Sequence, residues 1–595
     1  AGDQLHGRAR HVVSTLTSVH HIGVTVADLD RALGFWEPFL GVEARWRMVL
    51  ERPYLGQVTG YDRIRIDAAV VDLPGGGALE LLAYLLDERG ESHPETARPG
   101  NVHICLATTR IEDDFAMGYW GEAMAHNHPI WGDPQETEAA REALRRIPAA
   151  VEITDRERGW LDAVKILYGE GEKPSRDRAY AAAMEEIHRK YPEDIEAALF
   201  FSLALMGTVS PEDPAGEETR LWAGAIADEA FEKHPDHPGA AHYVIHAYDD
   251  PENAAKALEA ARRYAEIAPE APHALHMPSH IFLQLGMWPA AAASNEASWS
   301  ASNQWVEKEG LPVGKRDYHS LHWLLYVYLQ QGRYREAEKL LAEMRETLPR
   351  IDPSDPRSLM FGAFTHAMMA STFVVETERW DSAENLLTLP GTAAPDAQTP
   401  SGEVNPLAAY AVLAEIPAIF ARGLAHAAEG AEGASENTAR LRAIRDDSSA
   451  SEPMIAQIVE ATRIQEQEIL ALSRASKGER EEAIQMSRDA AAAEEATAPP
   501  PGPPPSIKPA HELLAEVLLS ADRPEEASKA FETSLDRHEG RARSLLGLAR
   551  AAARGGDREA ARKAYERFAS QWRHADAELA ELREAREFLS ETDGR

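Results

Sequence analysis

Hydrophobic and polar positions follow two different patterns along this chain, and the change comes near residue 110. In the first part, the segment 28–40 has apolar residues at helical spacing. Around it are short apolar runs bounded by turn residues, which predict strands. These runs cover residues 19–26, 44–50, 63–73, 79–82 and 101–108. The order predicts a small α+β unit of the form β-α-β-β-β, followed by one further strand.

From about Ile111 nearly every segment has the apolar spacing of an amphipathic helix, and alanine becomes frequent. A turn residue followed five positions later by alanine recurs and indicates helix-turn-helix units. It occurs at Gly286–Ala291, Gly332–Ala337, Glu378–Ala383, Gly478–Ala483, Asp522–Ala527 and Gly555–Ala560. The alanines are 46, 46, 100, 44 and 33 residues apart, and the last spacing is close to the 34-residue tetratricopeptide period. The segment 324–344 resembles a tetratricopeptide repeat most closely, so we predict an all-α solenoid of this type.

The chain of 595 residues is too long for one hydrophobic core. We predict an α+β module at 1–110 and a helical solenoid at 111–497, followed by a proline-rich loop at 498–509. Residues 510–595 would form C-terminal tetratricopeptide repeats and a cap. The loop either separates that cap from the rest or is a simple interdomain linker.

The net charge of −36 comes from 98 acidic and 62 basic residues. Such a charge repels phosphate backbones and anionic lipids, which argues against nucleic-acid and membrane partners. The single cysteine, Cys105, excludes an internal disulfide framework and favours a cytoplasmic location. No continuous apolar run is long enough for a transmembrane helix.

The segment from His21 to Gly41 resembles the opening of the vicinal oxygen chelate superfamily, which includes glyoxalases and extradiol dioxygenases. Residues 77–82 resemble its fourth strand, and residues 101–106 the start of its second module. The resemblance implies a glyoxalase-like module that binds a divalent metal. Its ligands would fall on His21, Glu80 and His103.

The similarity ends at about Thr109, before the second module could supply its remaining strands and a fourth ligand. The metal face is therefore incomplete, completed by another chain in a homo-oligomer, or vestigial. If it is functional, the metal would act as a Lewis acid on a substrate with adjacent oxygens.

A second set of candidate ligands lies in the helical part, where seven histidines fall between residues 234 and 280. His242 with His246, and His276 with His280, are i, i+4 pairs, so each pair shares one helix face. The two pairs are 34 residues apart, which places them on successive first helices of the repeats. We predict one metal ion held by these four histidines. Because histidine ordinarily titrates near 6.5, its affinity should fall between pH 7 and pH 5.

Further polar residues could join this site from neighbouring helices, the carboxylates either as ligands or as acceptors that fix the imidazole tautomers. They are His319, His322, His366, His126, His128, Glu122, Asp249 and Asp250. Neutral imidazoles with carboxylates suit Cu, Fe, Zn, Mn or Ni. The alternatives are a hydrogen-bonded packing network and a pH-sensitive groove without metal.

The two histidine-rich stretches also resemble a group of bacterial tetratricopeptide proteins that share the motifs His-Pro-x3-His-Tyr-x-Ile-His-x-Tyr-Asp and His-x2-His-Met-Pro-Ser-His. The leading hypothesis is a metal-dependent enzyme that acts on a small oxygenated or chelating substrate. The alternative is a non-catalytic scaffold that binds a peptide in its concave groove and carries a vestigial sensor module.

Overall fold

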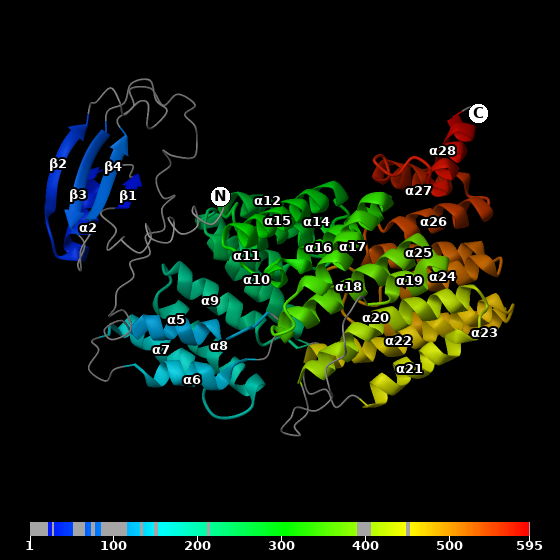
Figure 1. The fold of residues 1–595 in the computed structure, drawn as a ribbon, viewed down its shortest axis with the longest axis horizontal. Coiled ribbons are helices and arrows are strands. Elements are labelled where there is room, and N and C mark those ends of the chain that lie inside the picture. The colour runs from blue at the N-terminus through cyan, green and yellow to red at the C-terminus, as the bar shows by residue number, and fades with distance from the viewer. Residues whose placement is uncertain are drawn as a thin grey trace, which may run out of the picture. The chain divides into compact units, whose positions relative to one another are not determined.

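The computed structural model describes residues 22–25, 29–50, 66–72, 78–84, 116–130, 135–147, 153–210, 215–389, 406–447 and 453–593. The chain divides into two compact units, residues 1–111 and 112–595. Strands dominate the described part of the first unit and helices the second (Figure 1).

The first unit contains one four-stranded sheet with the strand order β1-β4-β3-β2. Strand β1 runs parallel to β4, and the other neighbouring pairs are antiparallel. Its elements are β1 (Ile22–Thr25), α2 (Leu29–Leu40), β2 (Ala44–Leu50), β3 (Ile66–Asp72) and β4 (Ala78–Tyr84). The predicted β-α-β-β-β order is confirmed, whereas the further strand predicted at 101–108 lies outside the described residues.

Alternation along the strands explains the core of this unit. Ala69 and Val71 of β3 lie opposite Leu81 and Leu79 of β4, so all four side chains share one face of the sheet. They are fully buried and pack with Leu29 and Leu33 of α2. Helix α2 therefore covers this face of the sheet.

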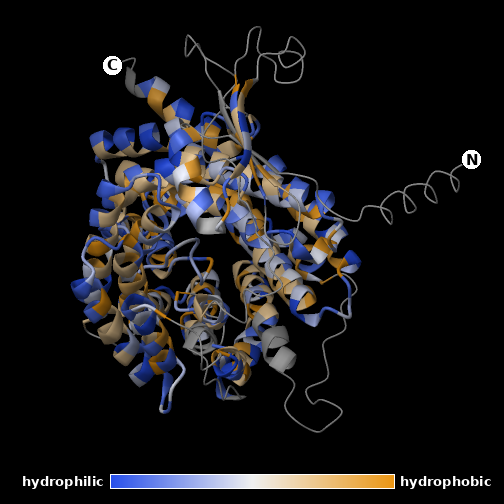
Figure 2. Ribbon diagram, turned by 90° about the vertical axis from the view of Figure 1, so that its left-hand side faces the viewer, coloured by the Kyte–Doolittle hydropathy of each residue, from blue (hydrophilic) through white to orange (hydrophobic). Residues whose placement is uncertain are grey.

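The second unit is an array of antiparallel helix pairs. In chain order its α-helices are α5 (Ala116–Ala125), α6 (Thr137–Arg145), α7 (Asp155–Leu167), α8 (Lys173–Lys190), α9 (Ile195–Met206), α10 (Gly216–Lys233), α11 (Pro238–Ala247), α12 (Leu258–Ile267), α13 (Pro272–His276), α14 (Pro278–Gln284), α15 (Trp288–Lys308), α16 (Tyr318–Gln330), α17 (Tyr334–Thr347), α18 (Pro356–Thr377), α19 (Ala383–Leu387), α20 (Pro406–Ala428), α21 (Gly433–Asp447), α22 (Pro453–Ser476), α23 (Arg480–Glu495), α24 (Ala510–Ser520), α25 (Pro524–Arg537), α26 (Ala542–Arg554), α27 (Arg558–Gln571) and α28 (Ala580–Asp593). Most carry apolar and polar residues on different faces (Figure 2), as expected when neighbours cover each apolar face.

The turn residue and alanine of the sequence motif have clear structural roles. The turn residue adopts the left-handed conformation that ends a first helix, as Gly332 does with a φ of 69°. The alanine five positions later is buried where the second helix packs on the first, as for Ala337. The same holds at the other predicted motifs from residue 286 to residue 527.

In the last motif the residues shift by one position from those predicted. Gly556, not Gly555, has the positive φ, of 85°, and Ala561 rather than Ala560 is fully buried. The buried alanines Ala527 and Ala561 are thus 34 residues apart, one tetratricopeptide period. The C-terminal helix pairs therefore follow this repeat more closely than the sequence pattern suggested.

The proline-rich segment 498–509 is not a simple interdomain linker. Its Ile507 and Lys508 are buried, and the Pro500 carbonyl accepts a hydrogen bond from Gln284. The helices that follow it also pack back onto the middle of the array. Trp572 of the C-terminal part donates to the carbonyl of Gln330, so residues 112–595 form one compact unit.

Helix α18 is the one described helix long and apolar enough to cross a membrane. Its apolar window is 78% buried among the other helices. Burial of this kind is typical of a core helix in a large helical array.

Candidate metal centre

Six histidines come together from three consecutive first helices of the array. Helix α11 supplies His242 and His246, and helix α16 supplies His319. The short helices α13 and α14, which meet at Met277, supply the others. Among the described residues, potential ligand atoms form two groups of three: His242, His246 and His273, and His276, His280 and His319.

In the first group, the Nε2 atom of His242 is the central atom. It lies 3.0 Å from Nε2 of His246 and 3.0 Å from Nε2 of His273. Tyr264 of α12 stacks on the His242 ring at a centroid distance of 5.4 Å. The Nε2 atoms of His246 and His273 therefore both face Nε2 of His242.

In the second group, oxygen acceptors hold the Nδ1 atoms. Nδ1 of His276 lies 2.7 Å from Oδ1 of Asn295, and the Asn295 amide nitrogen donates to the Ala291 carbonyl, which fixes the amide orientation. Nδ1 of His280 lies 2.6 Å from Oδ2 of Asp249. Acceptors at Nδ1 favour the tautomer whose Nε2 is the ligand atom. The two Nε2 atoms are 3.2 Å apart.

Asp249 is in turn positioned by Gln284, whose amide donates to Oδ1 at 3.2 Å. This buried carboxylate is not a member of either ligand group. It acts through the imidazole of His280, as the outer partner of a carboxylate–histidine–metal arrangement does.

Burial sets the charge of the cluster. It lowers the pKa of His242, His246, His276 and His280 well below the ordinary value, and neighbouring imidazoles lower it further. Burial also raises the pKa of Asp249 well above its usual range. For the histidines, the lowered pKa favours neutral imidazole, which is the form that binds a metal.

An indole and the proline-rich segment border the second group. The Trp323 ring lies 4.3 Å from the ring centroid of His280 and 4.9 Å from that of His276. The backbone of Pro501 is hydrogen-bonded to His280, and Gly502 packs against the Trp323 indole. These contacts bring the proline-rich segment to the edge of the site.

The predicted set of ligands, the two i, i+4 pairs around one ion, differs from the candidate groups in the structure. His242 meets His273, one turn before His276, so the pairs belong to different groups. Sequence reasoning missed His273 as a ligand candidate. The signal was available, because His273 and His276 are three residues apart and share a helix face.

Other predicted ligands lie outside both groups. His322 and His366 have buried ring nitrogens without a hydrogen-bond partner among the described residues. His126 pairs with Glu136, and Glu122 pairs with Arg146. His128 belongs to neither group. Asp250 pairs with Arg220 at 2.7 Å.

The candidate ligands of the first unit can be placed only in part. His21 and His103 lie outside the described residues. The backbone of Glu80 is in β4, opposite Gly23 of the parallel strand β1.

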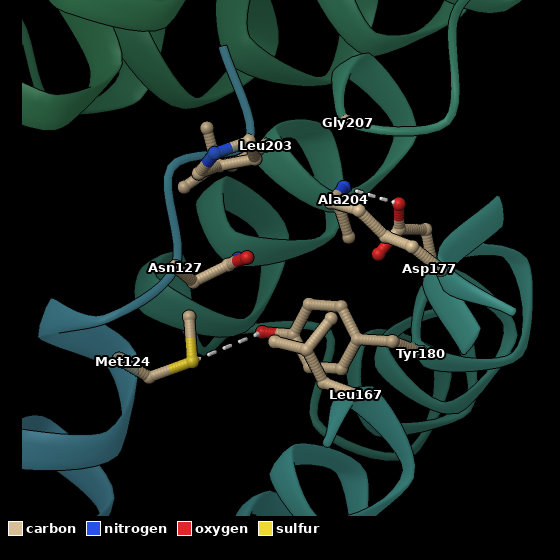
Figure 3. A pocket seen from close by; sticks show the side chains of 10 residues that line it. Met124, Asn127, Leu167, Asp177, Tyr180, Leu203, Ala204 and Gly207 are labelled. Atoms are coloured by element: carbon tan, nitrogen blue, oxygen red, sulfur yellow. Dashed lines mark hydrogen bonds and ion pairs between the residues drawn. The ribbon is translucent and has the colours of Figure 1, made fainter. Parts of the chain in front are cut away.

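A small cavity between helices α7, α8 and α9 is lined by Leu167, Asp177, Tyr180 and Leu203, among others (Figure 3). Tyr180 contacts Met124 there. The volume of about 10 Å³ leaves room for roughly one water molecule. None of the six clustered histidines lines this cavity.

No protein-family model matches the sequence, and no curated protein matches it. Solved structures of tetratricopeptide proteins are similar at a low level. The tetratricopeptide domain of P58(IPK) is 14% identical over 68% of this chain and 100% of its own, with a TM-score of 0.20. A human IFIT1 dimer with PPP-AAAA is 12% identical over 73% of this chain and 86% of its own, with a TM-score of 0.35. Yeast Tom70 is 10% identical over 71% of this chain and 93% of its own, with a TM-score of 0.26. The description of the helical part as tetratricopeptide-like therefore rests on its own helix pairs and turns.

Proposed function

We propose that this chain is a metal-binding helical-repeat protein whose cluster of six histidines holds a divalent transition metal. The observation that carries the proposal is the convergence of Nε2 atoms from three helices, at separations of 3.0 to 3.2 Å. An N···N separation of about 3.0 Å is also that of a hydrogen bond between two imidazoles. What favours metal over a packing network is that Asn295 and Asp249 hold Nδ1 of His276 and His280, which leaves the facing Nε2 atoms of these two rings without a proton to share.

The ligand type narrows the choice of metal. Neither group contains a carboxylate, and imidazole suits Zn, Cu, Fe and Ni better than Mn. Three protein ligands with a position left open are typical of catalytic rather than structural zinc sites. This arrangement supports a metal-dependent enzyme that acts on a small oxygenated or chelating substrate.

Metal content tests the proposal directly. We expect the full chain, freed of metal by chelator and then dialysed against Zn²⁺, to bind metal that His242→Ala plus His276→Ala removes. One ligand is lost from each group in this variant, while helical content by circular dichroism stays near that of the unchanged chain. His234→Ala, which alters an exposed histidine of the same segment, is the control and should bind metal normally. Equal metal content in the double variant and the unchanged chain would contradict the proposal.

For the first unit we propose a vicinal-oxygen-chelate-like module with its own metal site. Its support is the β-α-β-β-β order and the parallel pairing of β1, which His21 precedes, with β4, which contains Glu80. Glu80→Gln removes the single anionic ligand implied by the resemblance and should lower the metal content of this unit. The measurement is metal content in a background that already lacks the histidine-cluster metal. Full occupancy after Glu80→Gln would show that the resemblance does not extend to metal binding.

An interaction scaffold is the second candidate function, and the helical-repeat architecture favours it. Repeat arrays commonly bind peptides along a concave surface. Near the histidines, however, this chain's own segment 498–509 already lies against Trp323 and His280. A protein partner would therefore dock elsewhere on the array. If no metal binds in the experiment above, the scaffold is the better description.

A further inference from the structure

We infer that the histidine cluster holds two metal ions, one in each group of three histidines. This inference rests on the proposed metal binding and adds its stoichiometry and ligand assignment. His242, His246 and His273 would hold one ion, and His276, His280 and His319 the other.

The distances within each group fit a shared ion. At a metal–nitrogen distance of 2.0–2.1 Å, two nitrogens on a tetrahedral ion are about 3.3 Å apart. The Nε2 atoms of His276 and His280 are 3.2 Å apart, and those of His242 and His246 are 3.0 Å apart. All ligand atoms of a group lie within 4.8 Å of one another. Small rotations of the side chains would bring three nitrogens onto one ion.

The six imidazoles do not converge on a single point. The two groups have no member in common. Each i, i+4 pair is completed by a histidine from a different element, His273 for the first and His319 for the second. The rings of His246 and His280, one from each group, are 6.1 Å apart between centroids. The result is two adjoining sites rather than one site with six ligands.

The charge of the donors indicates which ligands the remaining coordination positions of each ion would bind. All six donors are neutral imidazoles, so each ion keeps its full double charge. Two buried carboxyl groups lie beside the donors: Asp249 is hydrogen-bonded to His280, and Asp317 interacts electrostatically with His276 and His319. A three-nitrogen face leaves at least one coordination position for water or a small anion. Azide is a suitable probe of this position.

The test compares two single variants with their combination in the full chain. Metal-free protein is titrated with Co²⁺, which reports binding and coordination through its visible absorption, and bound Zn²⁺ is counted separately by elemental analysis. We expect His273→Ala and His319→Ala each to lose one equivalent of metal relative to the unchanged chain. The combined variant should lose two equivalents. These differences do not depend on any metal held by the first unit. Azide should shift the Co²⁺ absorption that remains in either single variant.

His234→Ala is again the control and should lose no metal. If an alanine variant fails to fold by circular dichroism, His273→Gln and His319→Gln replace it with a side chain of similar size. The inference is overturned if either single variant loses all cluster metal, or if the combined variant loses only one equivalent. In both of those cases metal still binds, and the proposed function stands. A cluster that binds no metal at all fails differently, because His242→Ala plus His276→Ala then changes nothing.

Discussion

Replacing Arg541 with methionine should destabilise the helical unit by about 3–5 kcal/mol, the usual cost of removing one partner from a buried ion pair. Arg541 is fully buried, and its guanidinium contacts Glu376 of α18 at 2.6 Å and Glu512 of α24 at 2.7 Å. Tyr326 of α16 is a further neighbour at 3.3 Å. The variant leaves two carboxylates buried without this partner, where α18 meets α24 and the start of α26 in the C-terminal part.

The measurement is thermal denaturation followed by circular dichroism, with Arg562→Ala as the matched control. Arg562 pairs with Glu559 and Glu566 on the exposed face of α27, where such pairs contribute about 0–1 kcal/mol. A variant in which Glu376 and Glu512 also become apolar should recover much of the lost stability. If Arg541→Met and Arg562→Ala have the same melting temperature, the buried ion pairs of Arg541 do not hold the C-terminal helices in place.

Three buried histidines should each make the metal-free chain less stable at pH 5.5 than at pH 7.5, whereas buried carboxyl groups with a raised pKa, such as Asp249 and Glu468, act in the opposite direction. Burial lowers the pKa of His322 to about 3, that of His366 to about 4 and that of His538 to about 3. The unfolded chain has histidines with a pKa near 6.5. Below that value the unfolded state binds protons that the folded state does not, so stability falls as the pH falls. Between pH 7.5 and pH 5.5, each of these histidines lowers the free energy of unfolding by about 1.4 kcal/mol, which is about 4 kcal/mol for the three together.

His366→Leu isolates one part of this effect. The imidazole of His366 is fully buried, and neither ring nitrogen has a hydrogen-bond partner among the described residues. The variant should therefore melt at nearly the same temperature as the unchanged chain at pH 7.5, and higher than it at pH 5.5. Melting temperatures in the presence of chelator at both pH values provide the check. An equal pH dependence of the two proteins would show that His366 does not titrate on unfolding.

The same pKa directions revise the expected pH range of metal binding. The sequence alone placed the loss of affinity between pH 7 and pH 5, because exposed histidine titrates near 6.5. Burial lowers the pKa of the clustered histidines, so they stay neutral further into the acid range. Protons should therefore compete with the metal for these histidines only at a lower pH than they would for exposed histidines.

Local signals in the sequence were sufficient for the main elements of the fold. Glycine and alanine at fixed spacing reflect a left-handed turn and a tight helix contact, and both are local requirements. In the last motif two adjacent glycines left the position ambiguous by one residue, and only the backbone shows that Gly556 makes the turn. The hydrogen bond from Gln284 to Pro500 could not be predicted, because it joins residues 216 positions apart.

The candidate site was predictable as a set of residues but not as a geometry. The 34-residue spacing placed the histidine pairs on successive first helices, as the structure has them. It could not show that His273, rather than His276, contacts His242. The sequence indicated Asp249 as either a ligand or an outer acceptor, and the side-chain directions place it at Nδ1 of His280. The contact of Asn295 with His276 was not predicted, because no sequence spacing specifies it.

The bonds between distant helices change how this array should unfold. A repeat protein whose units touch only their neighbours loses structure from its ends, unit by unit. Here Gln330 accepts bonds from Gln571 and Trp572, 241 and 242 residues further along the chain, and Arg541 links α26 to α18. These hydrogen bonds and the ion pair close long loops, so the central and C-terminal repeats should unfold together, in one cooperative step. Shortening the chain from its C-terminus would then weaken the repeats that carry the histidines, although they lie hundreds of residues away.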